Sequence, residues 1–336
     1  MQCYINEHID YNYTSQMQSD SAGRALGSII TKMIKNKGFP YSIYSILYEA
    51  CVCSISQYGG EIFGYEKYDS SFKLHLRAAR AFLGLPKNVA SFGLVSELDW
   101  LLPHFQSQLK MIQYFGRIMC TRSNRWMYKI YIWDWDRNLN ESHQIVTWSS
   151  EVKSILHQHN LAYIFENQQI FSNKEITSKL KSSMREKQQE LLKTECQNKP
   201  KLRTFMLFKD FQILPPHVGK PLSFVERKTL SKLRLGILPI RIETARYVRP
   251  ILPEDQRLCY CNSGEVESEY YVLFECPMYD HLRQSWLNKL CIPENFHNLE
   301  QNEKLKVVLN EAKNVRHTAQ YLVSVMDLRC LLNKTY

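Results

Sequence analysis

The sequence lacks the features that define several large classes of protein. Its 336 residues contain no apolar run as long as a membrane span, and the first residues have neither the basic nor the apolar region of a secretory signal. Adjacent aspartates, a Gly-x-Ser-x-Gly elbow, a phosphate-cradling glycine loop and a His-Glu-x-x-His pair are also absent. We therefore expect an intracellular protein, nuclear or cytoplasmic, that is not an enzyme of these classes and has no small-molecule substrate.

The composition is that of a folded, basic protein. Hydrophobic residues make up 44% and aromatic residues 12%, a globular mixture. Ten cysteines without a secretory signal indicate reduced thiols rather than a disulfide framework. The net charge of +10 favours an anionic partner, and RNA or DNA is the commonest one.

Most of the positive excess lies between residues 199 and 257. Six Lys and seven Arg stand there against two Asp and three Glu, so 13 minus 5 gives +8. Ser223 and Glu226 form a capping-box pattern that predicts a helix running to Gly236. We expect Arg227, Lys228, Lys232 and Arg234 to cover one broad side of this cationic helix, with Leu230 and Leu233 on the other.

Helical periodicity recurs along the chain. Apolar residues repeat at helical spacing in 25–33, 42–57, 66–83 and 103–119, and again in 304–332, where they predict one helix or a pair. A polar helical run covers 173–201 and ends near Pro200. The pattern predicts a mainly α fold.

Three cysteines gather around a turn. Cys259 and Cys261 precede Asn262-Ser263-Gly264, and Cys276 lies on the return limb, just before Pro277. A structural zinc site needs four ligands, so the three thiolates need a partner, for which His281 and Glu269 are the candidates. The alternative is a small hairpin with buried free thiols.

Three blocks of sequence together resemble the region downstream of the polymerase palm in non-LTR (LINE-like) retrotransposon reverse transcriptases. They are Gln57-Tyr-Gly-Gly-Glu-Ile-Phe-Gly64, then Leu76-Arg-Ala-Ala-Arg-Ala-Phe-Leu-Gly-Leu-Pro86 with Glu97-Leu-x-Trp-Leu-x-Pro103, and the cysteine segment 257–283. The last is similar to that family's cysteine/histidine knuckle. It departs from the pattern in its Cys-x-Cys spacing and in having Tyr271 at the usual histidine position.

The resemblance implies a helical, thumb-like region over 1–125, a Trp-rich connection and spacer helix over 126–200, and a basic C-terminal lobe over 201–336 with a small zinc-knuckle-like hairpin. The family enzyme is an RNA-directed DNA polymerase that holds Mg²⁺ on palm aspartates, which this chain lacks, so the resemblance implies a non-catalytic fragment. It also implies sequence-independent binding of RNA or DNA, template-primer-like or single-stranded. The expected nucleic-acid contacts are Lys73, Arg77, Arg80, Lys110, Arg117, Arg227, Lys228, Lys232, Arg234, Arg241 and Arg246.

Two further interpretations concern the tryptophan-rich stretch and the function as a whole. We expect Trp126, Trp133, Trp135 and Trp148 to be core anchors, and Asp134 and Asp136 to serve a turn or a helix cap rather than a metal. For the function, a helical scaffold or protein-interaction module, or a decaying retroelement copy, is the alternative to nucleic-acid binding. In that case the charged residues solvate outer helix faces.

Overall fold

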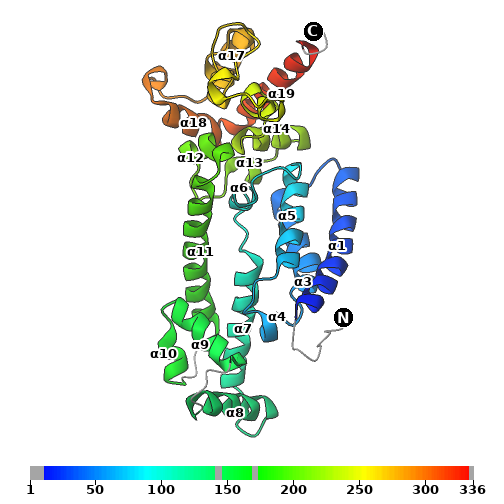
Figure 1. The fold of residues 1–336 in the computed structure, drawn as a ribbon, viewed down its shortest axis with the longest axis vertical. Coiled ribbons are helices and arrows are strands. Elements are labelled where there is room, and N and C mark those ends of the chain that lie inside the picture. The colour runs from blue at the N-terminus through cyan, green and yellow to red at the C-terminus, as the bar shows by residue number, and fades with distance from the viewer. Residues whose placement is uncertain (1–10, 141–145, 169–172, 333–336) are drawn as a thin grey trace. The chain divides into compact units, whose positions relative to one another are not determined.

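The computed structural model describes residues 11–140, 146–168 and 173–332, and helices dominate them (Figure 1). In this part of the chain the only β structure is one isolated antiparallel bridge between Leu258 and Val266. The prediction of a mainly α fold is therefore confirmed. No helix among the described residues is both long enough and apolar enough to cross a bilayer.

The chain divides into two compact units, and each unit combines three separate stretches of sequence. The first unit is Met1–Ser28, Leu47–His75 and Leu101–Glu190; the second is Ile29–Ile46, Leu76–Trp100 and Leu191–Tyr336. Helices α1 (Asn12–Lys35), α5 (Asp69–Leu83) and α11 (Asn173–Gln197) supply residues to both. The division into consecutive parts 1–125, 126–200 and 201–336 that the resemblance implies stays a prediction.

The central helix of the first unit is α7 (Pro103–Met119), which begins with Pro103 at its first helical position and buries Phe105, Ile112 and Phe115. Helix α4 (Gly60–Phe63) packs closely against α7. A Cβ at Gly64 would lie 2.6 Å from the carbonyl oxygen of Ser107, so only glycine permits this approach. The other elements of this unit are the π-helix η1 (Tyr48–Cys53), α3 (Ser54–Ser56), α8 (Trp126–Asn140), α9 (Trp148–Gln158) and α10 (Ala162–Glu166).

The second unit has an aromatic core near its N-terminal stretches. Buried Tyr44 contacts the rings of Phe82 and Trp100, and its hydroxyl donates to the carbonyl oxygen of Ala78 at 2.8 Å. This unit contains α2 (Tyr41–Leu47), α6 (Ser91–Ser96), η2 (Pro200–Leu202), α12 (Arg203–Phe208), α13 (Pro216–Gly219), α14 (Phe224–Arg234), α15 (Arg241–Thr244), η3 (Ala245–Tyr247), η4 (Glu254–Gln256), α16 (Glu269–Phe274), η5 (Pro277–Tyr279), α17 (Asp280–Leu287), η6 (Phe296–Asn298), α18 (Gln301–Asn310) and α19 (Val315–Leu332).

The helix boundaries follow the local signals of the sequence. The capping box is present at α14, where the Ser223 hydroxyl accepts from the backbone N–H of Glu226 and the Glu226 carboxylate accepts from that of Ser223. The polar run after residue 173 is the single helix α11, and the C-terminal pattern resolves into the pair α18 and α19. These predictions are confirmed.

Candidate metal centre and cationic residues

The candidate metal centre is built on a short hairpin that contains the three clustered cysteines. The backbone N–H of Cys259 donates to the carbonyl oxygen of Glu265 at 2.8 Å, and that of Glu267 donates to the carbonyl oxygen of Arg257 at 3.0 Å. At the tip, Asn262 and Gly264 adopt φ values of 59° and 80°, the left-handed backbone that a tight reversal requires. Cys276 immediately precedes η5, and its side chain lies beside the hairpin.

The three sulfur atoms lie close enough to bind one metal ion. The Sγ atoms of Cys259, Cys261 and Cys276 are all within 4.8 Å of one another. Those of Cys259 and Cys276 are 3.7 Å apart. Two thiolates bound to zinc at about 2.3 Å in a tetrahedron lie roughly 3.8 Å apart, so this separation suits a shared ion.

Tyr271 stands beside the cluster. Its hydroxyl oxygen lies 3.2 Å from the Sγ atom of Cys261 and 2.6 Å from the Oγ atom of Ser263. Burial raises the pKa of Tyr271, and its hydrogen bond with Cys261 raises it further. The Tyr271 side chain therefore reaches the site as a neutral phenol.

The two residues expected to complete the ligand set do not join it. His281 is exposed on α17 and is not part of the group of metal-ligating side chains formed by the cysteines. Glu269 is buried, and its carboxylate accepts from the hydroxyl of Thr204 at 2.9 Å and from the guanidinium of Arg203 at 3.1 Å. The prediction for His281 is thereby corrected: this exposed side chain is not part of the group that the three cysteines form.

A buried ion pair supports the hairpin from behind. The carboxylate of Glu267, which is fully buried, accepts from both terminal guanidinium nitrogens of Arg329 and from the backbone N–H of Arg241. The Cys259 Sγ atom also lies 3.6 Å from this carboxylate. The hairpin is thus fixed to α15 and α19, which holds the cysteines in place before any ion binds.

The pKa of one cysteine of the cluster, Cys276, is lowered by its surroundings. The hydrogen bond from the Cys259 thiol lowers the pKa of Cys276 to about 7 against the opposing effect of burial, and the backbone N–H of Met278 acts in the same direction. Because metal ions bind the thiolate rather than the thiol, this environment favours metal binding near neutral pH.

The structure separates the predicted nucleic-acid contacts by exposure. Lys73, Arg77 and Arg117 are exposed. Half-buried residues are Arg80, Lys110, Lys228, Lys232, Arg241 and Arg246. Some of these make internal contacts: Lys110 donates to the carbonyl oxygen of Gln57, and Arg246 pairs with Glu243 at 3.1 Å.

For Arg227 and Arg234 the prediction is corrected, because both side chains are buried. Their spacing places them with Leu230 on one face of α14, and that face turns inward. Arg227 donates to the carbonyl oxygen of Phe82 at 3.1 Å and lies over the Phe82 ring at 4.1 Å. Neither guanidinium is presented to a phosphate in solution.

Arg234 belongs to a buried charge cluster that no sequence pattern indicated. Its Nε atom donates to the Glu97 carboxylate at 2.7 Å, and a terminal nitrogen donates to the other oxygen at 3.1 Å. The Lys209 ammonium lies 3.5 Å from Glu97, and the His217 Nε2 atom lies 3.2 Å from it. Burial raises the pKa of Glu97, but Arg234 and then Lys209 outweigh burial and lower it to about 2. No local sequence signal links residues so distant in the chain.

The tryptophans of the 126–148 stretch do not share one role. Trp148 donates to the carbonyl oxygen of Glu61 at 3.0 Å and packs edge-on against Tyr131. Trp126 and Trp133, in contrast, are 78% and 62% exposed, so for them the expectation of core anchors is wrong. Asp134 accepts from the backbone N–H of Ser149 at 2.8 Å, in the first turn of α9, whose N-cap is Thr147.

No family model, no curated protein and no solved structure matches this chain.

Proposed function

We propose that this chain is a non-catalytic nucleic-acid-binding protein whose knuckle hairpin is held by a structural zinc ion, and that it corresponds to the region downstream of the palm in LINE-like reverse transcriptases. The observation that supports the metal is the convergence of three cysteine sulfurs on one hairpin. Cys259, Cys261 and Cys276 would hold the ion, and the Tyr271 hydroxyl lies beside Cys261. Zinc would supply folding energy there rather than chemistry.

The charge of the chain supports the nucleic-acid part of the proposal. With a net charge of +10, the protein attracts phosphates, and exposed Lys73, Arg77 and Arg117 can contact them without reading sequence. On α14, Lys228 and Lys232 remain as partly accessible cations after Arg227 and Arg234 turn inward. Binding of this kind depends on the release of counterions from the nucleic acid.

Metal analysis of the purified full-length protein tests the zinc site. We expect about one zinc per chain in the wild type and loss of the metal in Cys259→Ser and Cys276→Ser, because each removes one of three thiolate ligands. Cys291→Ser is the matched control, since Cys291 is exposed and lies outside the cluster. A zinc-free wild type, or a Cys276→Ser variant that retains full zinc, would contradict the proposal.

Titration of a fluorescent oligonucleotide at increasing salt tests nucleic-acid binding. The logarithm of the binding constant should fall linearly with the logarithm of salt concentration, with a slope of about −0.7 per phosphate neutralised on a single strand. The double variant Lys228→Glu/Lys232→Glu should bind more weakly and with a shallower slope. Absence of binding at low salt would favour the helical scaffold instead.

A further inference from the structure

Helix α8 presents an unusual combination of side chains to solvent. Trp126, Ile130 and Trp133 are 78%, 62% and 62% exposed. They are spaced by four and three residues, so they share one face of the helix. Large aromatic side chains normally contribute to a core or an interface, and two exposed tryptophans on one helix face indicate a binding surface.

Each exposed indole is accompanied by a cation. The Lys129 Nζ atom lies 5.3 Å from the ring centroid of Trp126, and the Arg137 guanidinium lies 5.4 Å from that of Trp133. Exposed Arg122 and Arg125 precede the helix directly. Between residues 122 and 137 there are four cations and two aspartates, and one of the aspartates, Asp134, accepts from the backbone N–H of Ser149. The surface is therefore aromatic and positively charged together.

The opposite face fixes the helix to the first unit. Tyr131 is 2% exposed, packs against the ring of Phe115, and donates its hydroxyl hydrogen to the side-chain oxygen of Gln168 at 2.8 Å. Because these contacts hold the inner face, the outer tryptophans are presented on a rigid element. They do not have to be ordered by the ligand.

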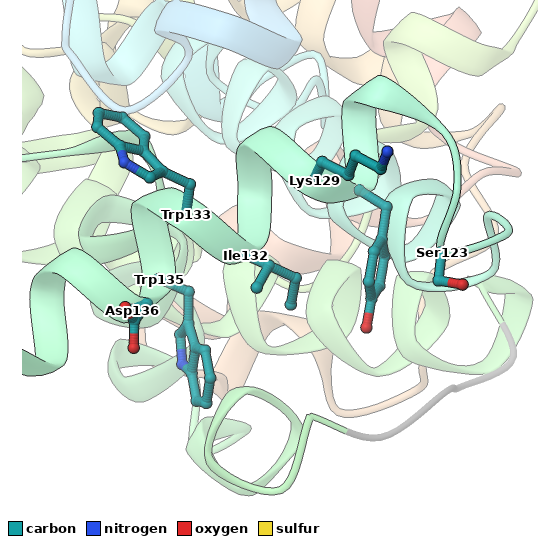
Figure 2. A pocket seen from close by; sticks show the side chains of 7 residues that line it. Ser123, Lys129, Ile132, Trp133, Trp135 and Asp136 are labelled. Atoms are coloured by element: carbon teal, nitrogen blue, oxygen red, sulfur yellow. The ribbon is translucent and has the colours of Figure 1, made fainter.

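A hollow of about 440 Å³ adjoins this face of α8 and shares Lys129 and Trp133 with it. Figure 2 shows Trp133 and Lys129 on one side of the helix and Ile132 and Trp135 on the other, with Ser123 on the preceding loop. Asp136 also lines the hollow and can accept from the amino groups of bases.

We infer that this face of α8, the α8 platform (Trp126, Lys129, Ile130, Trp133 and Arg137), binds unpaired, single-stranded nucleic acid by stacking bases on the two indoles while the adjacent cations contact phosphates. Stacking platforms beside cations are how proteins bind single strands without sequence preference. The two indoles are seven residues apart, or about 10 Å along the helix. That distance matches roughly three nucleotides at the 3.4 Å spacing of a stacked strand.

Charge and the distribution of apolar residues favour this partner over a lipid surface. A helix that lies in a membrane interface has a single wide apolar face. In α8 the apolar residues are divided between a buried face at Tyr131 and the exposed face at Ile130. The outward face that remains is aromatic rings paired with cations, which suits bases and phosphates.

The inference rests on the proposed nucleic-acid function and deepens it, and an abasic strand separates the two. The probes are a fluorescein-labelled oligothymidylate and an abasic strand of the same length, which carries the same phosphates without bases. The wild type should bind the oligothymidylate at least about fivefold more tightly than the abasic strand. Trp126→Ala/Trp133→Ala should lose at least about fivefold in affinity for the oligothymidylate and bind both strands alike.

Two control variants keep the result interpretable. Trp126→Phe/Trp133→Phe retains aromatic rings and should keep most of the preference for bases. Ile34→Ala removes a comparably exposed apolar side chain from α1, outside the platform, and should bind as the wild type does. All three variants should unfold at the wild-type urea concentration, because the side chains they change are exposed.

The outcomes that overturn the inference differ from one another. If the wild type binds both strands equally, or the double alanine variant keeps its preference, the platform is not a stacking site although the proposed function stands. If the wild type binds neither strand, both fail together. If phosphatidylserine vesicles bind the wild type and Ile130→Ala abolishes this, the surface is a lipid site. If sizing shows a dimer that the double alanine variant dissociates, it is a contact between copies.

Discussion

At the scale of single residues, two neighbouring cationic side chains on one helix have different environments. Arg227 and Lys228 are neighbours in sequence, yet the first is buried over Phe82 and the second remains partly accessible. The sequence shows the periodicity of α14 but not which face turns inward, because charged residues ordinarily mark the outside. Arg227 and Arg234 are exceptions, since the interior supplies carbonyl oxygens and the Glu97 carboxylate as acceptors.

This difference in burial predicts that two similar substitutions change the free energy of unfolding by very different amounts. Arg234→Leu leaves the Glu97 carboxylate buried without its bidentate partner, so we expect a loss of roughly 3–5 kcal/mol in the free energy of unfolding. Lys228→Leu on the same helix should change that free energy by no more than about 0.5 kcal/mol. Urea denaturation of both variants checks this. Equal effects would mean that Lys209 and His217 can neutralise Glu97 without Arg234.

The candidate metal centre shows how far residue-level prediction reached. The three cysteines could be selected from the sequence because they surround a turn signal, and the structure brings them together. The exclusion of His281 could not be foreseen, because it depends on where α17 begins and which way its first turn faces. Tyr271 reaches the cluster because α16 places it there.

At the scale of elements, local signals predicted helix boundaries well and helix surroundings poorly. Gly236 ends α14 with a φ of 64°, as its position after the last helical residue predicts. That the carbonyl oxygen of Lys201 lies against it could not be read from the sequence, since Lys201 is distant in the chain. A Cβ at position 236 would lie 1.9 Å from that oxygen.

Gly236 and Gly264 both have left-handed backbone, so substituting each by alanine gives a matched test of their surroundings. Gly264 has a φ of 80°, and a Cβ added there would meet no atom within 4 Å, so Gly264→Ala should cost only the backbone strain of about 1–2 kcal/mol. Gly236→Ala should cost clearly more, because the backbone near Lys201 must move as well. Thermal and urea unfolding measure the difference. A Gly236→Ala variant as stable as Gly264→Ala would show that the η2 turn shifts freely.

At the scale of the whole molecule, the helical class followed from periodicity, whereas the two units did not. Long helices such as α1 and α11 supply residues to both units, and nothing in their sequences marks where one unit ends. Tryptophan exposure was equally hidden. In the sequence, Trp126 and Trp133 cannot be distinguished from tryptophans of a core. They are exposed because Tyr131, on the opposite side of α8, packs inward.

Burial of neutral histidines makes the stability of the whole molecule depend on pH. Burial lowers the pKa of both His75 and His217 to about 3. The unfolded chain binds these protons near pH 6.5 and the folded chain does not, so stability is full above pH 6.5 and falls as the pH drops towards 3. Glu97 affects stability in a lower pH range. Because its pKa is lowered to about 2, its contribution to the free energy of unfolding is lost only below about pH 4.5.

The free energy of unfolding should therefore decrease between pH 7.5 and 5.5, with a slope that approaches about 1.4 kcal/mol per pH unit for each buried histidine. His217→Gln removes one of these groups, so its unfolding free energy should change less over the same interval, even if it is less stable throughout. His281→Gln, on the exposed surface of α17, is the control and should keep the wild-type dependence. Urea titrations at both pH values measure all three proteins. An identical pH dependence in His217→Gln and the wild type would show that His217 is protonated in the folded chain, where its Nε2 atom faces Glu97 at 3.2 Å.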